Sequence, residues 1–240
     1  MKLRFLDYRY AEAVLDHPNF SQSKGEIRDI LEKAPAPLLD PGELDPRRGG
    51  VKRRKREPTK ANPAPRYFFL PVDQKALNRY LDIEFKRRKW ELQPPIVGPD
   101  RAGGPETGLK GDYKKGRLQV EVQLGNMARW YTDVFKFQLS YSLGEIDVAV
   151  LVVPTQAFAN VIDENVAYFE RVSRELPWAK MSLTLPIWVI GIEPVDYGPV
   201  RDCYKQAAAN FVAARKKAGE AAVAIPFSQR LAEEPPAEEG

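Results

Sequence analysis

Two almost uninterrupted apolar stretches constrain the fold of this chain more than any other feature: "IDVAVLVVP" at 146–154 and "LPIWVIGIEP" at 185–194. A strand whose side chains are apolar on both faces normally lies at the centre of a sheet, with helices covering either side. Segments with helical periodicity precede, separate and follow these two strands. The predicted helices span residues 23–34, 73–90, 127–141, 160–176 and 201–220. Alternating strands and helices predict an α/β fold with a central mixed β-sheet flanked by helices.

The length of 240 residues fits a single domain covering 1–240. Residues 35–65 are rich in proline, glycine and charge and show no periodicity, so we expect a flexible insertion outside the core. The acidic segment "AEEPPAEEG" predicts a disordered tail after about residue 228. Ser23 and Glu26 have the spacing of a capping box at the start of the first helix.

Composition indicates the cellular compartment. Cys203 is the only cysteine, which excludes an internal disulfide. The N-terminal "MKLRFLDYRY" lacks the apolar core of a signal peptide, and no apolar run approaches the roughly 20 residues that span a bilayer. We therefore expect a protein of the reducing cytoplasm with no membrane segment. His17 is the only histidine, so serine-type catalytic triads and histidine-rich zinc sites are excluded.

The stretch "GDYKKGRLQVEVQLGN" at 111–126 carries the chemistry. Strand side chains alternate between faces, so Glu121 and Gln123 point the same way while their apolar neighbours point to the other face. "YKKGR" is a plausible turn, which would bring Asp112 close to Glu121 across a hairpin. Two such carboxylates and a backbone carbonyl suit Mg²⁺, which binds oxygen ligands and keeps several waters. The same pattern also fits a hairpin with a solvated polar face, and spacing alone favours that simpler interpretation.

The order Asp112 … Glu121-Val122-Gln123 resembles the PD-(D/E)XK nuclease site in the variant of the BglII/BstYI-type restriction endonucleases, which carry glutamine where most relatives carry lysine. The resemblance covers most of the chain. It continues through "VEVQLGN", "YSLGEIDVAVLVVP", "VAYFERVSREL" and "LPIWVIGIEP", and the N-terminal "MKLRFLDYRYAEAVL" is similar to the start of the family. It does not extend to residues 35–65 or to the tail after about Gly219.

The resemblance implies a role for each site residue. It makes Asp112 and Glu121 ligands of Mg²⁺, with the Val122 carbonyl as a third ligand. Gln123 would orient the attacking water, although it lacks the positive charge of a lysine. Gln93 corresponds to an auxiliary polar residue of the active site, and a surface glutamine is an equal alternative.

The resemblance also implies contacts with double-stranded DNA. Asn126, Lys136 and Asn165 match or neighbour family positions that touch DNA; the alternatives are a turn residue, a surface lysine and a helix-cap asparagine. The segment from Gln156 to Asn165 is similar to the family region that enters the major groove, which implies a palindromic target with GATC at its centre. "KRRKR" at 52–56 would either bind phosphates, act as a localisation signal or lie in a solvated loop.

Trp130, Tyr131 and Phe135 fit either the core or a subunit interface, where aromatic side chains are enriched.

The functional hypothesis from the sequence is a cytoplasmic, prokaryotic type II restriction endonuclease that acts as a homodimer, depends on Mg²⁺ and has a cognate DNA methyltransferase as its genetic partner. Two rivals stay open: a repair or modification-directed nuclease on the same fold, and a DNA-binding protein whose catalytic site has decayed.

Overall fold

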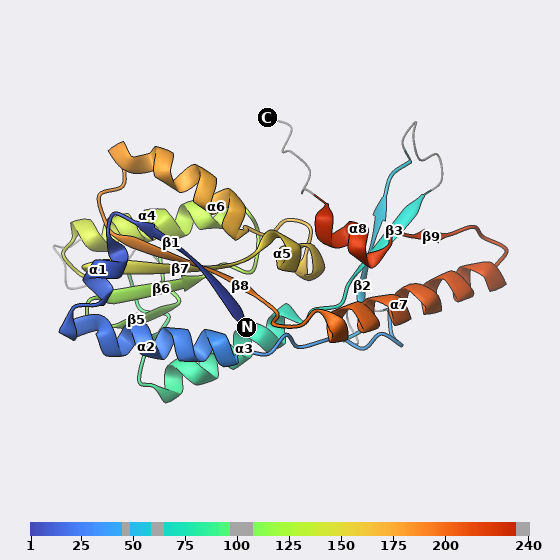
Figure 1. Ribbon diagram of the computed structural model, residues 1–240, viewed down its shortest axis with the longest axis horizontal. Coiled ribbons are helices and arrows are strands. Elements are labelled where there is room, and N and C mark those ends of the chain that lie inside the picture. The colour runs from blue at the N-terminus through green and yellow to red at the C-terminus, as the bar shows by residue number, and fades with distance from the viewer. Residues whose placement is uncertain (45–48, 59–64, 97–107, 234–240) are drawn as a thin grey trace.

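The computed structural model describes residues 1–44, 49–58, 65–96 and 108–233. Its main sheet has six strands in the order β1-β8-β7-β6-β5-β4 (Figure 1). These strands are β1 (Lys2–Tyr8), β4 (Glu91–Leu92), β5 (Tyr113–Lys115), β6 (Leu118–Val122), β7 (Val148–Pro154) and β8 (Ile187–Glu193). β6, β7 and β8 are parallel, and the strands on either side of them are antiparallel. The sheet is therefore mixed, as the sequence predicts.

The two apolar stretches form β7 and β8, adjacent strands near the middle of the sheet. Every residue of β7 is buried, and so are the first six residues of β8. The helices are α1 (Ala11–Leu15), α2 (Pro18–Lys33), α3 (Gln74–Arg87), α4 (Arg129–Ser142), α5 (Gln156–Ile162), α6 (Phe169–Glu175), α7 (Gly198–Lys217) and α8 (Phe227–Ala232), with a 3₁₀ helix at Leu176–Met181. No helix among the described residues is long and apolar enough to cross a bilayer.

Helices cover both faces of the main sheet. On one face, Val150 and Val152 of β7 belong to a core that also takes side chains from α2 and α3. On the other face, Leu151 and Val153 belong to a core with side chains from α4 and α6. Glu121 is paired in register with Leu151 in the parallel β6–β7 ladder, so its side chain points to the α4 face.

A second sheet of three strands, β2 (Lys52–Arg56), β3 (Arg66–Leu70) and β9 (Val223–Ala224), packs with α7 and α8 at the other end of the molecule (Figure 1). The expectation of an irregular insertion over 35–65 is wrong at 52–56, because "KRRKR" pairs with β3 as an antiparallel strand. The long basic side chains stabilise it. The Arg53 guanidinium lies 4.8 Å from the centre of the Phe211 ring and that of Arg56 lies 4.9 Å from the centre of Phe68.

Three further expectations need correction. The first long helix begins at Pro18, capped by the His17 ring nitrogen, so Ser23 is a buried interior residue and there is no capping box. The predicted helix over 160–176 is two helices, α5 and α6, separated by residues 163–168. The predicted disordered tail is ordered in part, because α8 places Phe227 and Arg230 in the core. Residues 234–240 lie outside the described part of the chain.

Candidate active site

The hairpin of β5 and β6 places Asp112 beside the end of β6. The turn between the strands includes Gly116, whose φ of 57° lies in the left-handed region that favours glycine. Asp112 precedes β5, and its Oδ2 accepts a hydrogen bond from the Val122 N–H at 2.8 Å. The predicted approach of Asp112 to the end of the Glu121 strand is therefore present.

The polar face of β6 is buried, so the interpretation as a solvated hairpin is wrong. Gln119 and Glu121 are each 1% exposed and Gln123 is 7% exposed. Glu121 Oε1 accepts from Gln119 Nε2 at 2.8 Å and from the Asp112 N–H at 3.3 Å. A Cβ at Gly111 would come within 2.9 Å of both Gln119 Nε2 and Glu121 Oε1. A side chain at position 111 would therefore displace the Gln119 amide or the Glu121 carboxylate from its place in the site.

Helix α4 supplies two charged side chains that the sequence pattern did not assign to the catalytic centre. Lys136 Nζ lies 2.5 Å from Glu121 Oε2 and 2.8 Å from Asp133 Oδ1, and it also donates to the Lys110 carbonyl at 3.2 Å. Asp133 Oδ2 accepts from Gln123 Nε2 at 2.9 Å. Asp133 therefore connects Gln123 to Lys136, and Lys136 connects α4 to Glu121.

Burial dominates the electrostatics of the two carboxyl groups. Burial raises the pKa of Asp112, although the hydrogen bond from the Val122 N–H opposes the shift. Burial and the neighbouring charge of Asp112 raise the pKa of Glu121 to about 8, against the opposing charge of Lys136. Burial alone would lower the pKa of Lys136, but the charges of Glu121 and Asp133 raise it overall. Each carboxylate disfavours ionisation of the other, and a divalent cation bound between them would relieve this repulsion.

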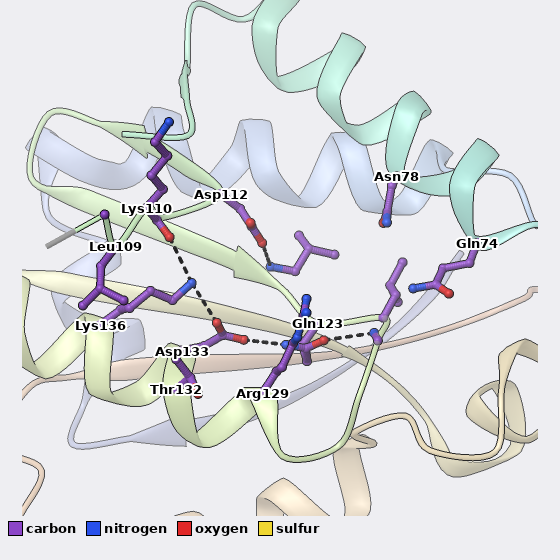
Figure 2. A pocket seen from close by; sticks show the side chains of 14 residues that line it. Gln74, Asn78, Leu109, Lys110, Asp112, Gln123, Arg129, Thr132, Asp133 and Lys136 are labelled. Atoms are coloured by element: carbon purple, nitrogen blue, oxygen red, sulfur yellow. Dashed lines mark hydrogen bonds and ion pairs between the residues drawn. The ribbon is translucent and has the colours of Figure 1, made fainter. Parts of the chain in front are cut away.

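A pocket of about 660 Å³ opens in front of this group (Figure 2). Asp112, Val122 and Gln123 line it from the hairpin, and Lys136 lines it from α4. Its other lining residues are Gln74, Asn78, Gly108, Leu109, Lys110, Leu124, Gly125, Arg129, Thr132 and Asp133. Polar groups thus converge on one cavity from the hairpin, from α4 and from α3.

Sequence reasoning missed the contribution of α3. The amide side chains of Gln74 and Asn78 point from α3 toward the pocket, one turn apart on the helix (Figure 2). Gln93, which the resemblance placed there, is exposed and does not line this cavity in the described part of the chain. Its N–H donates to the Asp112 carbonyl at 2.9 Å, so it supports the backbone of the site. The sequence contains one pattern that could have indicated this contribution: Gln74 and Asn78 are amide residues four positions apart, so they lie on the same face of α3.

The donor set is compatible with Mg²⁺. Asp112 and Glu121 supply carboxylate oxygens, and the main chain at Val122 lies against the same cavity. Among the described residues, no three histidine, cysteine, aspartate or glutamate side chains are grouped as a metal site. Two carboxylates leave several positions for water, which Mg²⁺ prefers to retain, whereas structural zinc sites use four protein ligands.

The structure brings two of the expected DNA-binding residues together. Asn126 forms a β-bridge with Val166, and the Met127 N–H donates to the Asn165 carbonyl at 2.9 Å. Asn126 and Asn165 are both exposed. Lys136 differs from them, because it is 8% exposed and its ammonium group points into the carboxylate cluster.

The basic strand β2 faces the same loop. Lys52 Nζ lies 3.6 Å from Asp163, and Arg54 Nε lies 3.3 Å from Glu164. Arg56 pairs with Glu164 at 3.1 Å. The positive charges of "KRRKR" are therefore partly balanced by the acidic residues that precede Asn165.

Comparison with known proteins identifies the family. The restriction endonuclease family BglII/BglIII matches residues 3–192. The chain belongs to this family.

Solved structures agree with that assignment. Restriction endonuclease BglII complexed with a DNA 16-mer is 20% identical, with a TM-score of 0.60 over 81% of this chain and 78% of that chain. Free BglII is 19% identical, with a TM-score of 0.53 over 81% of this chain and 80% of that chain. The search of curated proteins returns no match. The predicted PD-(D/E)XK-like fold is confirmed. The predicted enzyme class, a type II restriction endonuclease and hence a site-specific deoxyribonuclease, is confirmed as well.

Proposed function

We propose that this restriction endonuclease cleaves both strands of a short palindromic DNA site in a reaction that depends on Mg²⁺. The observation that carries the proposal is the pairing of two carboxylates at the end of β6: Glu121 is buried, and the half-buried Asp112 beside it lines a polar pocket. Asp112 and Glu121 would hold Mg²⁺, with the Val122 carbonyl as a third protein ligand. When bound, Mg²⁺ supplies activation of a water and neutralisation of charge at the scissile phosphate.

The remaining residues would position the DNA and the attacking water. Lys110 and Arg129 are exposed at the pocket and carry the charges that a DNA backbone needs. Gln123 would orient the water. Its Nε2 is bonded to Asp133 and its Oε1 accepts from the Gly125 N–H at 2.9 Å, so its orientation is fixed.

We propose a homodimer as the active species, since one active site cuts one strand and a symmetric pair cuts both strands of a palindrome. Exposed aromatic side chains on the α4 side support this proposal. Trp130 belongs to the core, but Tyr131 and Phe135 are 48% and 59% exposed on α4, and Trp178 of the nearby 3₁₀ helix is 85% exposed. Such aromatic groups are enriched in protein interfaces.

The target is proposed to contain GATC at its centre. The support is the exposed Asn165 beside Asn126, at the end of the segment that resembles the groove-binding region of the family. Asparagine can pair with adenine through two hydrogen bonds in the major groove. We further propose cytoplasmic action, with a cognate DNA methyltransferase that protects the host genome.

Two plasmid experiments test the proposal. Incubation with Mg²⁺ should give discrete fragments, and excess EDTA should leave the plasmid intact. Nicking or smearing would favour a repair nuclease, and a gel shift of intact DNA would favour a binding protein without activity. A plasmid series with and without GATC tests the specificity. Efficient double-strand cleavage of a GATC-free plasmid would contradict the proposed GATC target but not the proposed nuclease activity.

A further inference from the structure

Lys136 is a buried lysine whose ammonium group is fully occupied. Its side chain is 11% exposed, and its three donors reach Glu121 Oε2, Asp133 Oδ1 and the Lys110 carbonyl. An isolated ammonium group is costly to bury, so its position must be stabilised by these partners. The group is nevertheless not sealed in the core, because Lys136 forms part of the pocket wall (Figure 2).

Gln123 occupies a neighbouring position without any charge. Both polar ends of its side chain are bonded, Nε2 to Asp133 and Oε1 to the Gly125 N–H. Asp133 accepts Gln123 on one carboxylate oxygen and Lys136 on the other. A side chain from β6 and a side chain from α4 therefore meet at the same carboxylate, and only the one from α4 is cationic.

The charge balance of the pocket requires such a cation. Asp112 and Asp133 line the pocket, Glu121 lies behind them and would add a third negative charge on ionising to bind a metal, and a DNA phosphodiester adds a fourth. One divalent cation balances two of these charges, and the low-dielectric site makes the remainder expensive. Lys110 and Arg129 line the pocket but are exposed. Among the described residues that line this pocket, Lys136 is the one basic side chain that is buried.

We propose that Lys136 supplies, from helix α4, the positive charge of the active site that Gln123 does not supply, and that this charge stabilises the scissile phosphate electrostatically from beside Glu121 and Asp133. The alternative is a purely structural lysine that keeps Asp133 and Glu121 in place. The inference rests on the proposed function. The experiment distinguishes failure of the inference from failure of the proposed function. If the wild-type protein cuts no duplex with Mg²⁺ or Mn²⁺, the proposed function is wrong. If Lys136→Gln cuts as fast as wild type, only the inference is wrong.

The test compares three variants. Lys136→Gln removes the charge, and Gln123→Lys/Lys136→Gln moves it from α4 to β6. Lys115→Gln is the matched control, because Lys115 is also partly buried, contacts two carboxylate oxygens of Glu26 and donates to the Arg88 carbonyl, away from the pocket. The measurements are single-turnover cleavage of a duplex at saturating Mg²⁺, and Mn²⁺ binding by the protein without DNA.

A charge that acts on the phosphate predicts that Lys136→Gln lowers the single-turnover rate by about 100-fold or more, the scale for one preorganised electrostatic group. Mn²⁺ binding should be equal or tighter, because Glu121 loses a competing cation. The double variant should regain at least about tenfold in rate, and Lys115→Gln should retain the wild-type rate.

An unchanged rate in Lys136→Gln would overturn the proposal, and so would a loss of Mn²⁺ affinity that accounts for the loss of rate. The double variant keeps the charge balance of the site, so it decides the question even if Lys136→Gln does not fold. A folded double variant that binds Mn²⁺ but does not cleave would also overturn the proposal.

Discussion

Asp112 Oδ2 accepts the Val122 N–H at 2.8 Å, beyond the last paired residues of the β5–β6 hairpin. The carboxylate takes the place that a backbone carbonyl would occupy if the antiparallel ladder continued. Strand pairing thus sets the position of Asp112 relative to Glu121, and the site inherits the rigidity of the sheet. Asp112 also lines the pocket, so the same side chain serves the sheet and the site.

The first prediction concerns the two carboxylates. Asp112→Asn and Glu121→Gln keep the shape of each side chain and remove one negative charge, so each should lower cleavage by about 100-fold or more. DNA binding should survive, because phosphate contacts are made by other residues. Cleavage assays and fluorescence anisotropy with the same duplex check both statements. Glu26→Gln is the control, since Glu26 is also ion-paired but lies outside the pocket; turnover retained in either site variant would contradict the assignment.

The second prediction concerns stability without metal. Glu121 has a pKa of about 8 in the folded protein against an ordinary value of 4.5, so between these values the folded state binds more protons than the unfolded state. The free energy of unfolding should therefore fall as pH rises from about 5 to 8, by up to about 1.4 kcal/mol per pH unit for each such group. Asp112 adds to the fall above its ordinary pKa of 3.8, because burial raises its pKa as well.

Urea unfolding in EDTA at several pH values measures this dependence. Glu121→Gln should show a smaller fall than wild type, because one titrating group has been removed. Mg²⁺ at pH 8 should stabilise wild type more than Glu121→Gln. A wild-type stability that rises over the same pH range, or equal slopes for both proteins, would contradict the prediction.

The extent to which the sequence predicts this structure depends on the range of each interaction. The two apolar stretches predict β7 and β8 because burial on both faces leaves a continuous pattern. The alternation at Glu121 and Gln123 and the turn at Gly116 predict the hairpin for the same local reason. The fold of "KRRKR" is not predictable in this way, because Arg53 and Arg56 gain their stabilisation from Phe211 and Phe68, which are distant in sequence.

The same limit applies to the site. Asp133 and Lys136 lie three residues apart on α4, a spacing that fits an ordinary surface ion pair. Their role in the centre depends on how α4 packs over β6, which periodicity does not specify. Ser23 and Glu26 satisfied the capping pattern, but His17 followed by Pro18 started the helix earlier, and Glu26 instead pairs with Lys115.

The third prediction concerns assembly. Phe135→Asp should convert the proposed dimer to a monomer, because it places a charge in an aromatic interface. Ile83→Asp on α3 is the matched control, since Ile83 is 57% exposed and Phe135 is 59% exposed. Sedimentation velocity with and without duplex measures the state of both variants. A wild-type protein that stays monomeric on its duplex, or equal effects of the two substitutions, would exclude an interface at Phe135.

The fourth prediction concerns the acidic loop before Asn165. Asp163 and Glu164 either read a base in the groove or restrain the cations of β2, and their ion pairs with Lys52, Arg54 and Arg56 favour the second role. Asp163→Asn/Glu164→Gln should therefore tighten binding to a noncognate duplex and steepen its salt dependence by about one unit of slope for each basic side chain released to a phosphate. Anisotropy titrations over a range of NaCl concentrations measure both quantities.

Glu12→Gln/Asp16→Asn removes the same charge from the ion pairs of Lys24 and controls for net charge. If the loop variant instead loses affinity only for the cognate duplex, Asp163 or Glu164 contacts a base, and β2 contributes nothing beyond the fold.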